Sequence, residues 1–338
     1  MTIKNAIAQL SQQQDLDAEM MTQSMQQIMT GQATDAQIGA FLMALQLKGE
    51  TVIEITAAAQ VMRELASTVD INAPILVDTC GTGGDNAHTF NVSTASAFVV
   101  SAAGATVAKH GNRSISSRSG SADVLEAAGV NIDLSPTQVK YCIEKIGIGF
   151  MFAQQHHSAM KHAIGPRKEL GIKSLFNLLG PLTNPARASH QLLGVYDKKW
   201  VLPMAEVLQS LGCQRALVVS ARDGLDEISI AAPTDVAELK AGNIKQYTLD
   251  PSQFGFYSTD LEALTINNPN ASLATIFSVF DGQSGPARDI ISLNAGAAIY
   301  TAELTNTLHD GIEMAKQILD NGKARQQLDT LIAYSQQL

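Results

Sequence analysis

Two short segments of the chain are rich in glycine and hydroxyl side chains, and each follows an apolar, strand-like run. The first reads GTGGD at 81–85, and the second reads KHGNRS at 109–114. Glycines let the backbone approach an anion closely, and free amides at the start of a following helix can donate hydrogen bonds to it. The two segments therefore predict a cradle for a ligand that carries phosphates at two ends.

Either segment alone would be weak evidence, because a glycine run is equally typical of an ordinary tight turn. The first segment, however, is followed by NVST at 91–94, where a helix is expected to start, and the second adds the cations Lys109 and Arg113. Two donor-rich turns in equivalent positions favour phosphate binding over two unrelated turns.

A pair of carboxylates, Asp226 and Glu227, stands in DGLDEIS at 223–229, just after the apolar run 216–220. Adjacent carboxylates at the end of a buried strand suit a hard cation, which takes oxygen ligands and relieves their repulsion. Mg²⁺ bound to phosphate oxygens is the natural inference. An isolated Asp-Glu pair is more often a solvated turn, so the interpretation depends on the phosphate cradle.

A third cluster, between 156 and 187, places a basic stretch before an apolar helical stretch that ends in Gly-Pro and Asn-Pro turns. Arg167 in this cluster can form a bidentate pair with a carboxylate. His156, His157 and His162 are expected to pack or to form hydrogen bonds, since they are not convincing zinc ligands.

Helical patterns alone occupy the N-terminal part of the chain. Asp17, Thr34 and Thr51 are expected helix caps, and apolar residues recur at helical spacing after each of them. After Pro74, short apolar runs alternate with helical patterns, and a hairpin is expected over 236–249. The expected strands are 75–77, 106–108, 148–152, 191–195 and 216–220.

This order predicts an α/β protein in which a small N-terminal all-helical domain is joined to a larger α/β domain with a mainly parallel sheet flanked by helices. We expect the helical domain at 1–72, with part of 165–188 packing on it, and the α/β domain at 73–338. Ligands should then bind at the carboxyl ends of the strands.

Composition narrows the partners of the chain. The net charge of −9 over 338 residues argues against a nucleic-acid partner. The cysteines Cys80, Cys142 and Cys213 are odd in number and lack CxxC spacing, so we expect buried thiols and neither a disulfide framework nor a zinc site. No signal-peptide core or membrane-length apolar run is present, so a cytoplasmic protein without a membrane partner is expected.

Five motifs occur in one order across nearly the whole chain: GTGGD, NVSTA, KHGNRSISSRSGSADVLEAAG, GPRKELG…FNLLGPLTNPA and DGLDEIS. Together they closely resemble the anthranilate phosphoribosyltransferases of tryptophan biosynthesis. The resemblance implies a cleft where 5-phosphoribosyl 1-diphosphate meets anthranilate, and dimerisation through the helical domain. Phe41, Leu42 and Leu45, which share one apolar helix face, are expected to form the seam of the homodimer.

The resemblance also implies roles for single residues. Contacts with 5-phosphoribosyl 1-diphosphate are implied for Gly81, Gly84, Asp85, Thr89, Asn91, Val92, Ser93, Thr94, Lys109, His110, Gly111, Asn112, Arg113, Ser114, Ile115, Ser116, Ser117 and Ser121. Contacts with anthranilate are implied for Gly81, Asn112 and Arg167. Mg²⁺, expected as two ions, is implied to bind to Ser93, Asp226 and Glu227.

The implied chemistry suits this residue set, which contains no convincing pair of nucleophile and base. Displacing diphosphate from the anomeric carbon puts negative charge on the leaving group, so a cation and amide donors supply most of what is needed. The attacking aromatic amine is already neutral at pH 7, and we expect no residue to act as nucleophile or base. Positioning of the two substrates then carries much of the rate enhancement.

Two alternatives remain at this point. A pyrimidine-nucleoside phosphorylase resembles this fold and has a related glycine-rich loop, but its typical lysine-serine feature near the first loop is absent. A non-catalytic relative that binds nucleic acid would need a basic groove, against which the net acidity and the intact Asp226-Glu227 pair both argue.

Overall fold

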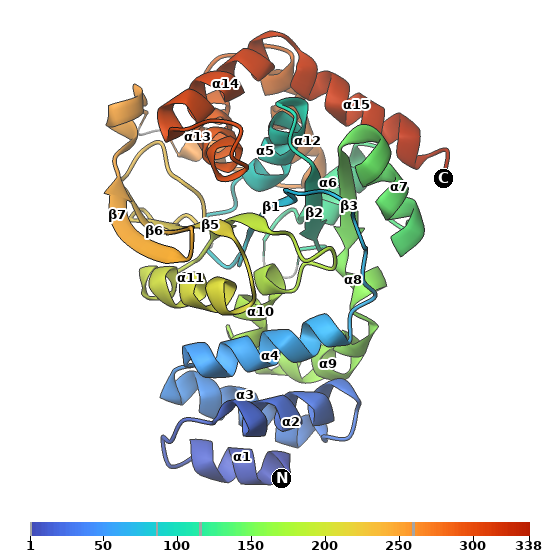
Figure 1. Ribbon diagram of the computed structural model, residues 1–338, viewed down its shortest axis with the longest axis vertical. Coiled ribbons are helices and arrows are strands. Elements are labelled where there is room, and N and C mark those ends of the chain that lie inside the picture. The colour runs from blue at the N-terminus through green and yellow to red at the C-terminus, as the bar shows by residue number, and fades with distance from the viewer. Residues whose placement is uncertain (1, 86, 115–116, 259–260) are drawn as a thin grey trace.

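The computed structural model describes residues 2–85, 87–114, 117–258 and 261–338. Ile115 and Ser116, two of the predicted substrate contacts, lie outside the described residues. Figure 1 shows a stack of helices from the N-terminal part below a sheet that is covered by further helices. No helix among the described residues is long and apolar enough to cross a membrane.

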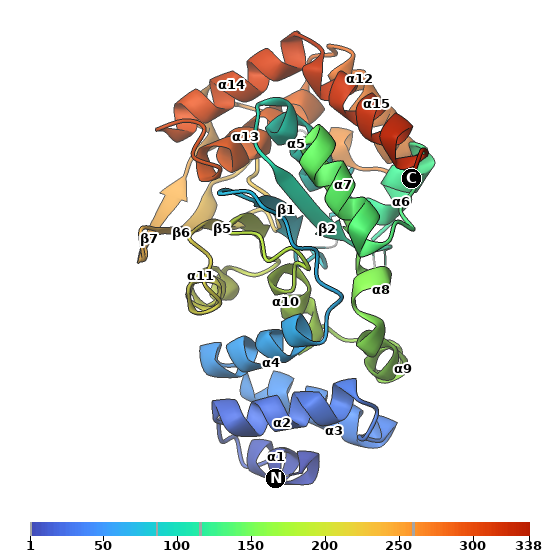
Figure 2. The same cartoon turned by 45° about the vertical axis from the view of Figure 1, so that its right-hand side comes forward.

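Four helices form the N-terminal part: α1 (Ile3–Leu10), α2 (Ala18–Met29), α3 (Asp35–Lys48) and α4 (Val52–Glu64). The expected caps are confirmed, because Asp17 accepts a hydrogen bond from the amide of Met20, and Thr34 and Thr51 each open a capping box. Two later helices, α9 (Lys161–Leu170) and α10 (Leu175–Leu182), pack on α2, α3 and α4, as both views show (Figures 1 and 2).

The predicted dimer seam at Phe41, Leu42 and Leu45 is wrong. All three side chains have no exposed surface within the single chain. Helix α3 packs against α1, α9 and α10, so helices of the same chain cover the face that the sequence left unpartnered. Although part of 165–188 was expected to pack on the helical domain, the sequence does not show which helix face the elements of the same chain cover.

The sheet has seven strands in the order β3-β2-β1-β4-β5-β6-β7. Its strands are β1 (Val77–Gly81), β2 (Val107–Gly111), β3 (Ile148–Phe152), β4 (His190–Gly194), β5 (Arg215–Ala221), β6 (Thr234–Lys240) and β7 (Asn243–Leu249). The first five in this order are parallel, and β6 and β7 add an antiparallel hairpin at one edge. The predicted fold class is therefore confirmed.

Helices cover both faces of the sheet, and neighbouring strand residues alternate between the two cores. In β5, Ala216 and Val218 belong to the core shared with α11 and the N-terminal helices, whereas Leu217 and Val219 belong to the opposite core. The remaining α-helices are α5 (Val92–Ala102), α6 (Ser121–Ala127), α7 (Pro136–Ile146), α8 (Ala153–His156), α11 (Val201–Ser210), α12 (Pro269–Phe280), α13 (Pro286–Thr301), α14 (Leu308–Asp320) and α15 (Lys323–Ser335). The short 3₁₀ helices are Ser158–Met160, Lys198–Trp200, Pro251–Phe254 and Glu262–Leu264.

Candidate active site

The glycine loop after β1 folds against the loop after β5. The amide of Gly83 donates a hydrogen bond of 2.7 Å to Oδ2 of Asp226. A Cβ atom on Gly81 would collide with the same carboxylate, so the close approach requires glycine there. Gly83 and Gly84 have φ angles of +62° and +79°, in the left-handed region that glycine adopts readily. The first predicted phosphate turn and the predicted metal ligands therefore share one site.

Three carboxylates, those of Asp85, Asp226 and Glu227, face this loop. Burial, followed by the Asp85 carboxylate, raises the pKa of Asp226 to about 7, although the Gly83 amide opposes the shift. Burial and the Asp226 carboxylate likewise raise the pKa of Glu227 well above its ordinary value. The fold thus holds three carboxyl groups together at the carboxyl end of the sheet, where burial and mutual repulsion disfavour the charged forms of Asp226 and Glu227.

This donor set fits Mg²⁺. Carboxylate oxygens are its preferred protein ligands, and a divalent cation would remove the repulsion that raises both pKa values. Ser93 lies beside the pair, since its backbone amide hydrogen-bonds to Glu227 and lowers the pKa of that carboxyl. The structure therefore brings Ser93, Asp226 and Glu227 together.

Lys109 is the cation nearest to these carboxylates, and it is buried. Its Nζ donates a hydrogen bond of 2.6 Å to the carbonyl oxygen of Thr79. Its charge lowers the pKa of Glu227 but does not overcome the effect of burial. Because burial also lowers the pKa of Lys109 itself, its charge depends on the carboxylates around it.

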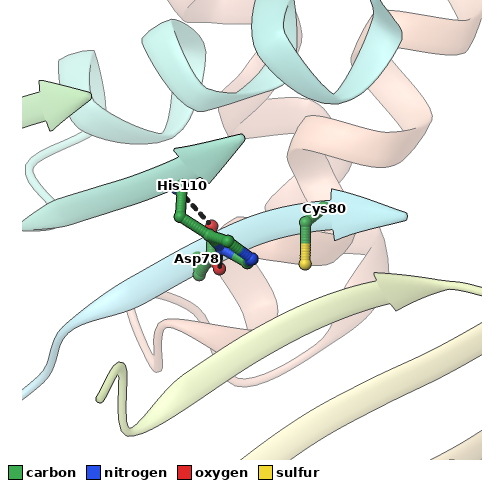
Figure 3. Close-up of side chains that lie close together, drawn as sticks. All are labelled: Asp78, Cys80 and His110. Carbon is green, nitrogen blue, oxygen red and sulfur yellow. Dashed lines mark hydrogen bonds and ion pairs between the residues drawn. The ribbon is translucent and has the colours of Figure 1, made fainter. Parts of the chain in front are cut away.

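A second charged cluster lies between β1 and β2 (Figure 3), where Asp78 is fully buried. His110 Nδ1 lies 2.5 Å from Asp78 Oδ2, and His110 Nε2 lies 2.8 Å from the carbonyl oxygen of Gly180. Asn184 donates 2.8 Å hydrogen bonds to Asp78 and to the carbonyl oxygen of Ala108. Every charge in this cluster therefore has a partner from the protein.

Both ring nitrogens of His110 face acceptors, so the ring is a double donor and carries a positive charge. Burial alone would lower the pKa of His110, but the Asp78 carboxylate outweighs it and the net shift is upward. Cys80 lies within reach of both groups (Figure 3), yet burial raises the pKa of its thiol strongly. A neutral thiol beside a paired carboxylate is a poor metal site, in line with the prediction that these cysteines bind no zinc.

The second predicted phosphate loop is closed by its own hydrogen bonds. Asp123 accepts hydrogen bonds from the amides of Ser114 and Gly120. Arg113 forms a bidentate pair with Glu126 at 2.6 and 3.0 Å and also reaches Asp123, so its charge is neutralised in this conformation. Other predicted contacts in the loop are also engaged: Asn112 Oδ1 accepts from the amide of Arg113, Ser114 bonds to Ser117, and Ser121 Oγ donates to the carbonyl of Asn112. Gly111 faces Ser121, where a Cβ atom would not fit.

Asn91 ties the two loops together. Its side-chain oxygen accepts hydrogen bonds of 2.7 Å from Ser119 and Ser272, and its amide nitrogen donates to the carbonyl of Ser119. Of the neighbouring predicted contacts, Thr89 pairs with Thr265 as an isolated bridge, Val92 is buried, and Oγ1 of Thr94 is buried without a hydrogen-bond partner among the described residues. The polar atoms of Asn91 are thus occupied by the protein.

Arg167 lies in the last turn of α9 with its guanidinium 5.0 Å from the ring centre of Phe176. Burial lowers the pKa of this guanidinium, and no carboxylate of the described residues pairs with it. His156 and His157 instead hydrogen-bond to the carbonyl oxygens of Ser67 and Thr183, which confirms the expectation for these two histidines. A half-buried guanidinium without a protein anion is suited to an anionic ligand.

Sequence reasoning missed the residues that support the site. Asp78, Asp123 and Asn184 are single polar residues that organise the strand ends and the second loop. Asp123 had a detectable signal, since acidic residues are typical of the first turn of a helix. Asn184 had none, because its partner Asp78 is 106 residues away in the chain.

Comparison with known proteins supports this picture. The chain matches the helical bundle domain of a glycosyl transferase family over residues 4–66 and the a/b domain of a glycosyl transferase family over residues 73–325. It is 59% identical over 337 residues to the anthranilate phosphoribosyltransferase of Methylococcus capsulatus, covering 100% of this chain and 99% of that protein.

Two solved structures share the fold over the whole chain. The anthranilate phosphoribosyltransferase of Thermus thermophilus superposes with a TM-score of 0.93 at 40% identity, covering 98% of this chain and 99% of the other. The Saccharomyces cerevisiae enzyme in complex with PRPP and Mg has a TM-score of 0.91 at 26% identity, covering 99% of this chain and 98% of the other.

Proposed function

The chain belongs to the family of anthranilate phosphoribosyltransferases, and from this premise we propose which of its residues perform the reaction. The reaction transfers the phosphoribosyl group of 5-phosphoribosyl 1-diphosphate to the amine of anthranilate, with loss of diphosphate, in tryptophan biosynthesis. The observation that carries the assignment is the cluster of Asp85, Asp226 and Glu227 against the glycine loop. Such a cluster needs a cation, and the reaction requires one.

Ser93, Asp226 and Glu227 are proposed to hold Mg²⁺, as two ions, which would supply positive charge for the leaving diphosphate. The glycine loop is proposed to position the diphosphate beside the first turn of α5, whose N-terminus has no side-chain cap. The second loop, from Lys109 to Ser121, is proposed to bind the other phosphate end. This would require Arg113 to exchange Glu126 for the substrate phosphate.

Arg167 is proposed to bind the carboxylate of anthranilate and to leave the amine free to attack. Within the part of the chain that the structure describes, no ion pair of its guanidinium competes with this role. Losing a charge-assisted bidentate pair costs about 1.5–3 kcal/mol. Arg167→Ala should therefore lower kcat/KM for anthranilate by roughly 10- to 150-fold, with little change in the KM for 5-phosphoribosyl 1-diphosphate. If Arg167→Ala instead weakened only the use of 5-phosphoribosyl 1-diphosphate, Arg167 would belong to the phosphate site.

The activity itself is tested by following the fluorescence of anthranilate with 5-phosphoribosyl 1-diphosphate and Mg²⁺. Fluorescence should fall with time, stop when EDTA is added, and fall again when excess Mg²⁺ is restored. A pyrimidine nucleoside with inorganic phosphate serves as the control reaction and should give no free base. Phosphorolysis of the nucleoside without consumption of anthranilate would overturn the function.

A homodimer is also proposed, with a seam that differs from the one expected above. Met43 and Leu47 lie one turn apart on α3, are 38% and 66% exposed, and form an exposed apolar stripe. Light scattering should give about twice the 35.9 kDa chain mass. Leu47→Glu should give a monomer, and a wild-type monomer at micromolar concentration would contradict the proposal.

The cytoplasmic location and the domain division also stay predictions. The packing of α9 and α10 on α2, α3 and α4 supports a helical domain at 1–72 that includes part of 165–188, with the α/β domain at 73–338.

A further inference from the structure

Lys173 lies in the short connection between α9 and α10 and reaches across to the glycine loop of the α/β part. Its Cε and Nζ atoms are 3.1 and 3.7 Å from the point where a Cβ atom on Gly84 would stand. Because α9 and α10 pack on the N-terminal helices, Lys173 brings a positive charge from that side of the molecule to the loop. The substrate contacts proposed above do not include Lys173.

The ammonium of Lys173 rests on an aromatic ring and on no anion. Nζ lies 4.0 Å from the ring centre of Tyr196, which is close enough for a cation–π contact. Among the described residues, no carboxylate forms an ion pair with it. A half-buried ammonium without a counter-charge, held at the edge of a glycine loop, is placed to receive a ligand anion.

Tyr196 is held firmly enough to act as a support for this ammonium. Its hydroxyl accepts a hydrogen bond of 3.1 Å from Trp200 Nε1, and its amide donates one of 3.1 Å to Thr82 Oγ1. Thr82 belongs to the glycine loop, so the ring and the loop are fixed relative to each other. The aromatic surface that the ammonium contacts is therefore set beside the glycine loop by the fold.

We propose that Lys173 is a further substrate-binding residue, whose ammonium contacts the diphosphate group of 5-phosphoribosyl 1-diphosphate above Gly84. The inference rests on the proposed placement of the diphosphate at the glycine loop. It also gives the connection that starts in α9 two roles, because Arg167 precedes Lys173 by six residues and is proposed to bind the other substrate. The last turn of α9 and the connection after it would then hold both substrates against the α/β part.

The test compares Lys173→Met with Lys168→Met, which removes an exposed lysine from the same segment. Lys173→Met should raise the KM for 5-phosphoribosyl 1-diphosphate and the inhibition constant of inorganic diphosphate by about tenfold, with the KM for anthranilate nearly unchanged. Lys173→Arg should restore most of the diphosphate affinity, because it keeps the charge. Lys168→Met should behave like the wild type in all three constants.

Gly84→Ala separates this inference from the placement of the diphosphate. Alanine at a φ of +79°, pressed against Lys173, should itself raise the KM for 5-phosphoribosyl 1-diphosphate. If Gly84→Ala raises this constant and Lys173→Met does not, the role of Lys173 is refuted while the placement stands. If neither variant changes it, the placement of the diphosphate is wrong as well. A loss of thermal stability shared by Lys173→Met and Lys173→Arg, without a specific effect on diphosphate, would show a structural role and overturn the proposal.

Discussion

Two charged clusters lie toward the carboxyl ends of the parallel strands. They differ in whether their charges have partners within the protein. In the inner cluster, Asp78 is paired with His110 and Asn184, and the pKa of its carboxyl is held below the ordinary value despite burial. In the outer cluster, Asp226 and Glu227 face Asp85, and the pKa values of the pair are raised. The first cluster is complete without a ligand, and the second is not.

The difference teaches how to separate structural from functional charge in one fold. A buried charge that finds its partners within the protein stabilises one arrangement of the chain. A group of like charges that the fold holds together, at a cost in stability, indicates a missing cation. Lys109 connects the two clusters. It lies in β2 next to His110, and its charge acts on Glu227 in the outer cluster, whereas His110 pairs with Asp78.

The comparison between the clusters predicts that the largest effect is a loss of activity when the outer cluster is changed. Replacing both carboxylates in Asp226→Asn/Glu227→Gln removes the charge that holds Mg²⁺ while keeping the size of both side chains. The kcat/KM for both substrates should fall by at least about 10³-fold at millimolar Mg²⁺, since metal stabilisation of the leaving group amounts to several kcal/mol. The fluorescence assay measures this, and an unimpaired double variant would rule out the metal site.

The inner cluster should instead respond in stability. Asp78→Asn leaves the charged His110 ring without its counter-charge, and breaking a buried ion pair in this way costs about 3–5 kcal/mol. Thermal unfolding of the Mg²⁺-free protein should show a melting temperature lower by roughly 5–15 °C. A variant as stable as the wild type would mean that the His110–Asp78 pair is not a charged pair.

The same type of substitution should have the opposite sign in the outer cluster. At pH 8 and without Mg²⁺, Asp226→Asn removes repulsion while its amide oxygen can still accept the Gly83 hydrogen bond. The free energy of unfolding should rise by on the order of 1 kcal/mol or more, because each unit of pKa shift corresponds to about 1.4 kcal/mol. Mg²⁺ should stabilise the wild type and have little effect on the variant. Destabilisation by Asp226→Asn would make the two clusters alike and remove the basis of the comparison.

The sequence predicted the outer cluster better than the inner one, for a physical reason. Asp226 and Glu227 directly follow an apolar run, and carboxyl ends of parallel strands meet at one edge, so their meeting with the glycine loop could be expected. The expected strands 75–77 and 106–108 end before Asp78 and Lys109, because polar residues argue against a buried strand.

In the structure, β1 and β2 continue through these polar residues, since Asp78 and His110 satisfy each other across the two strands. Asn184, which completes the pair, comes from a distant turn that no local pattern connects to β1. The same limit explains the wrong dimer seam, because the helices that pack against α3 and bury Phe41 are not given by the local pattern around it. Local patterns therefore predicted the elements, whereas the partners of buried groups required the tertiary structure.

The smallest expected effect is the pH dependence of the stability that the charged pair of the inner cluster contributes. Although burial opposes both shifts, the pair lowers the pKa of Asp78 below 3.8 and raises that of His110 above 6.5. The stabilisation by Asp78 is present above pH 3.8 and is lost as pH falls through its folded pKa. The stabilisation by His110 is present below pH 6.5 and is lost as pH rises through its folded pKa.

The pair should therefore contribute most between about pH 4 and pH 6.5. The difference in melting temperature between the wild type and His110→Asn should be largest in this window and should shrink above and below it. His157→Asn is a control of opposite sign, because burial lowers the pKa of His157 to about 4. The wild type therefore loses the contribution of His157 as pH falls from 6.5 toward 4, and the difference in melting temperature for His157→Asn should shrink steadily toward low pH without a maximum in the window. A difference for His110→Asn that keeps the same size from pH 4 to pH 9 would show that His110 acts through neutral hydrogen bonds, and the inner cluster would then owe its stability to packing and hydrogen bonding instead of paired charge.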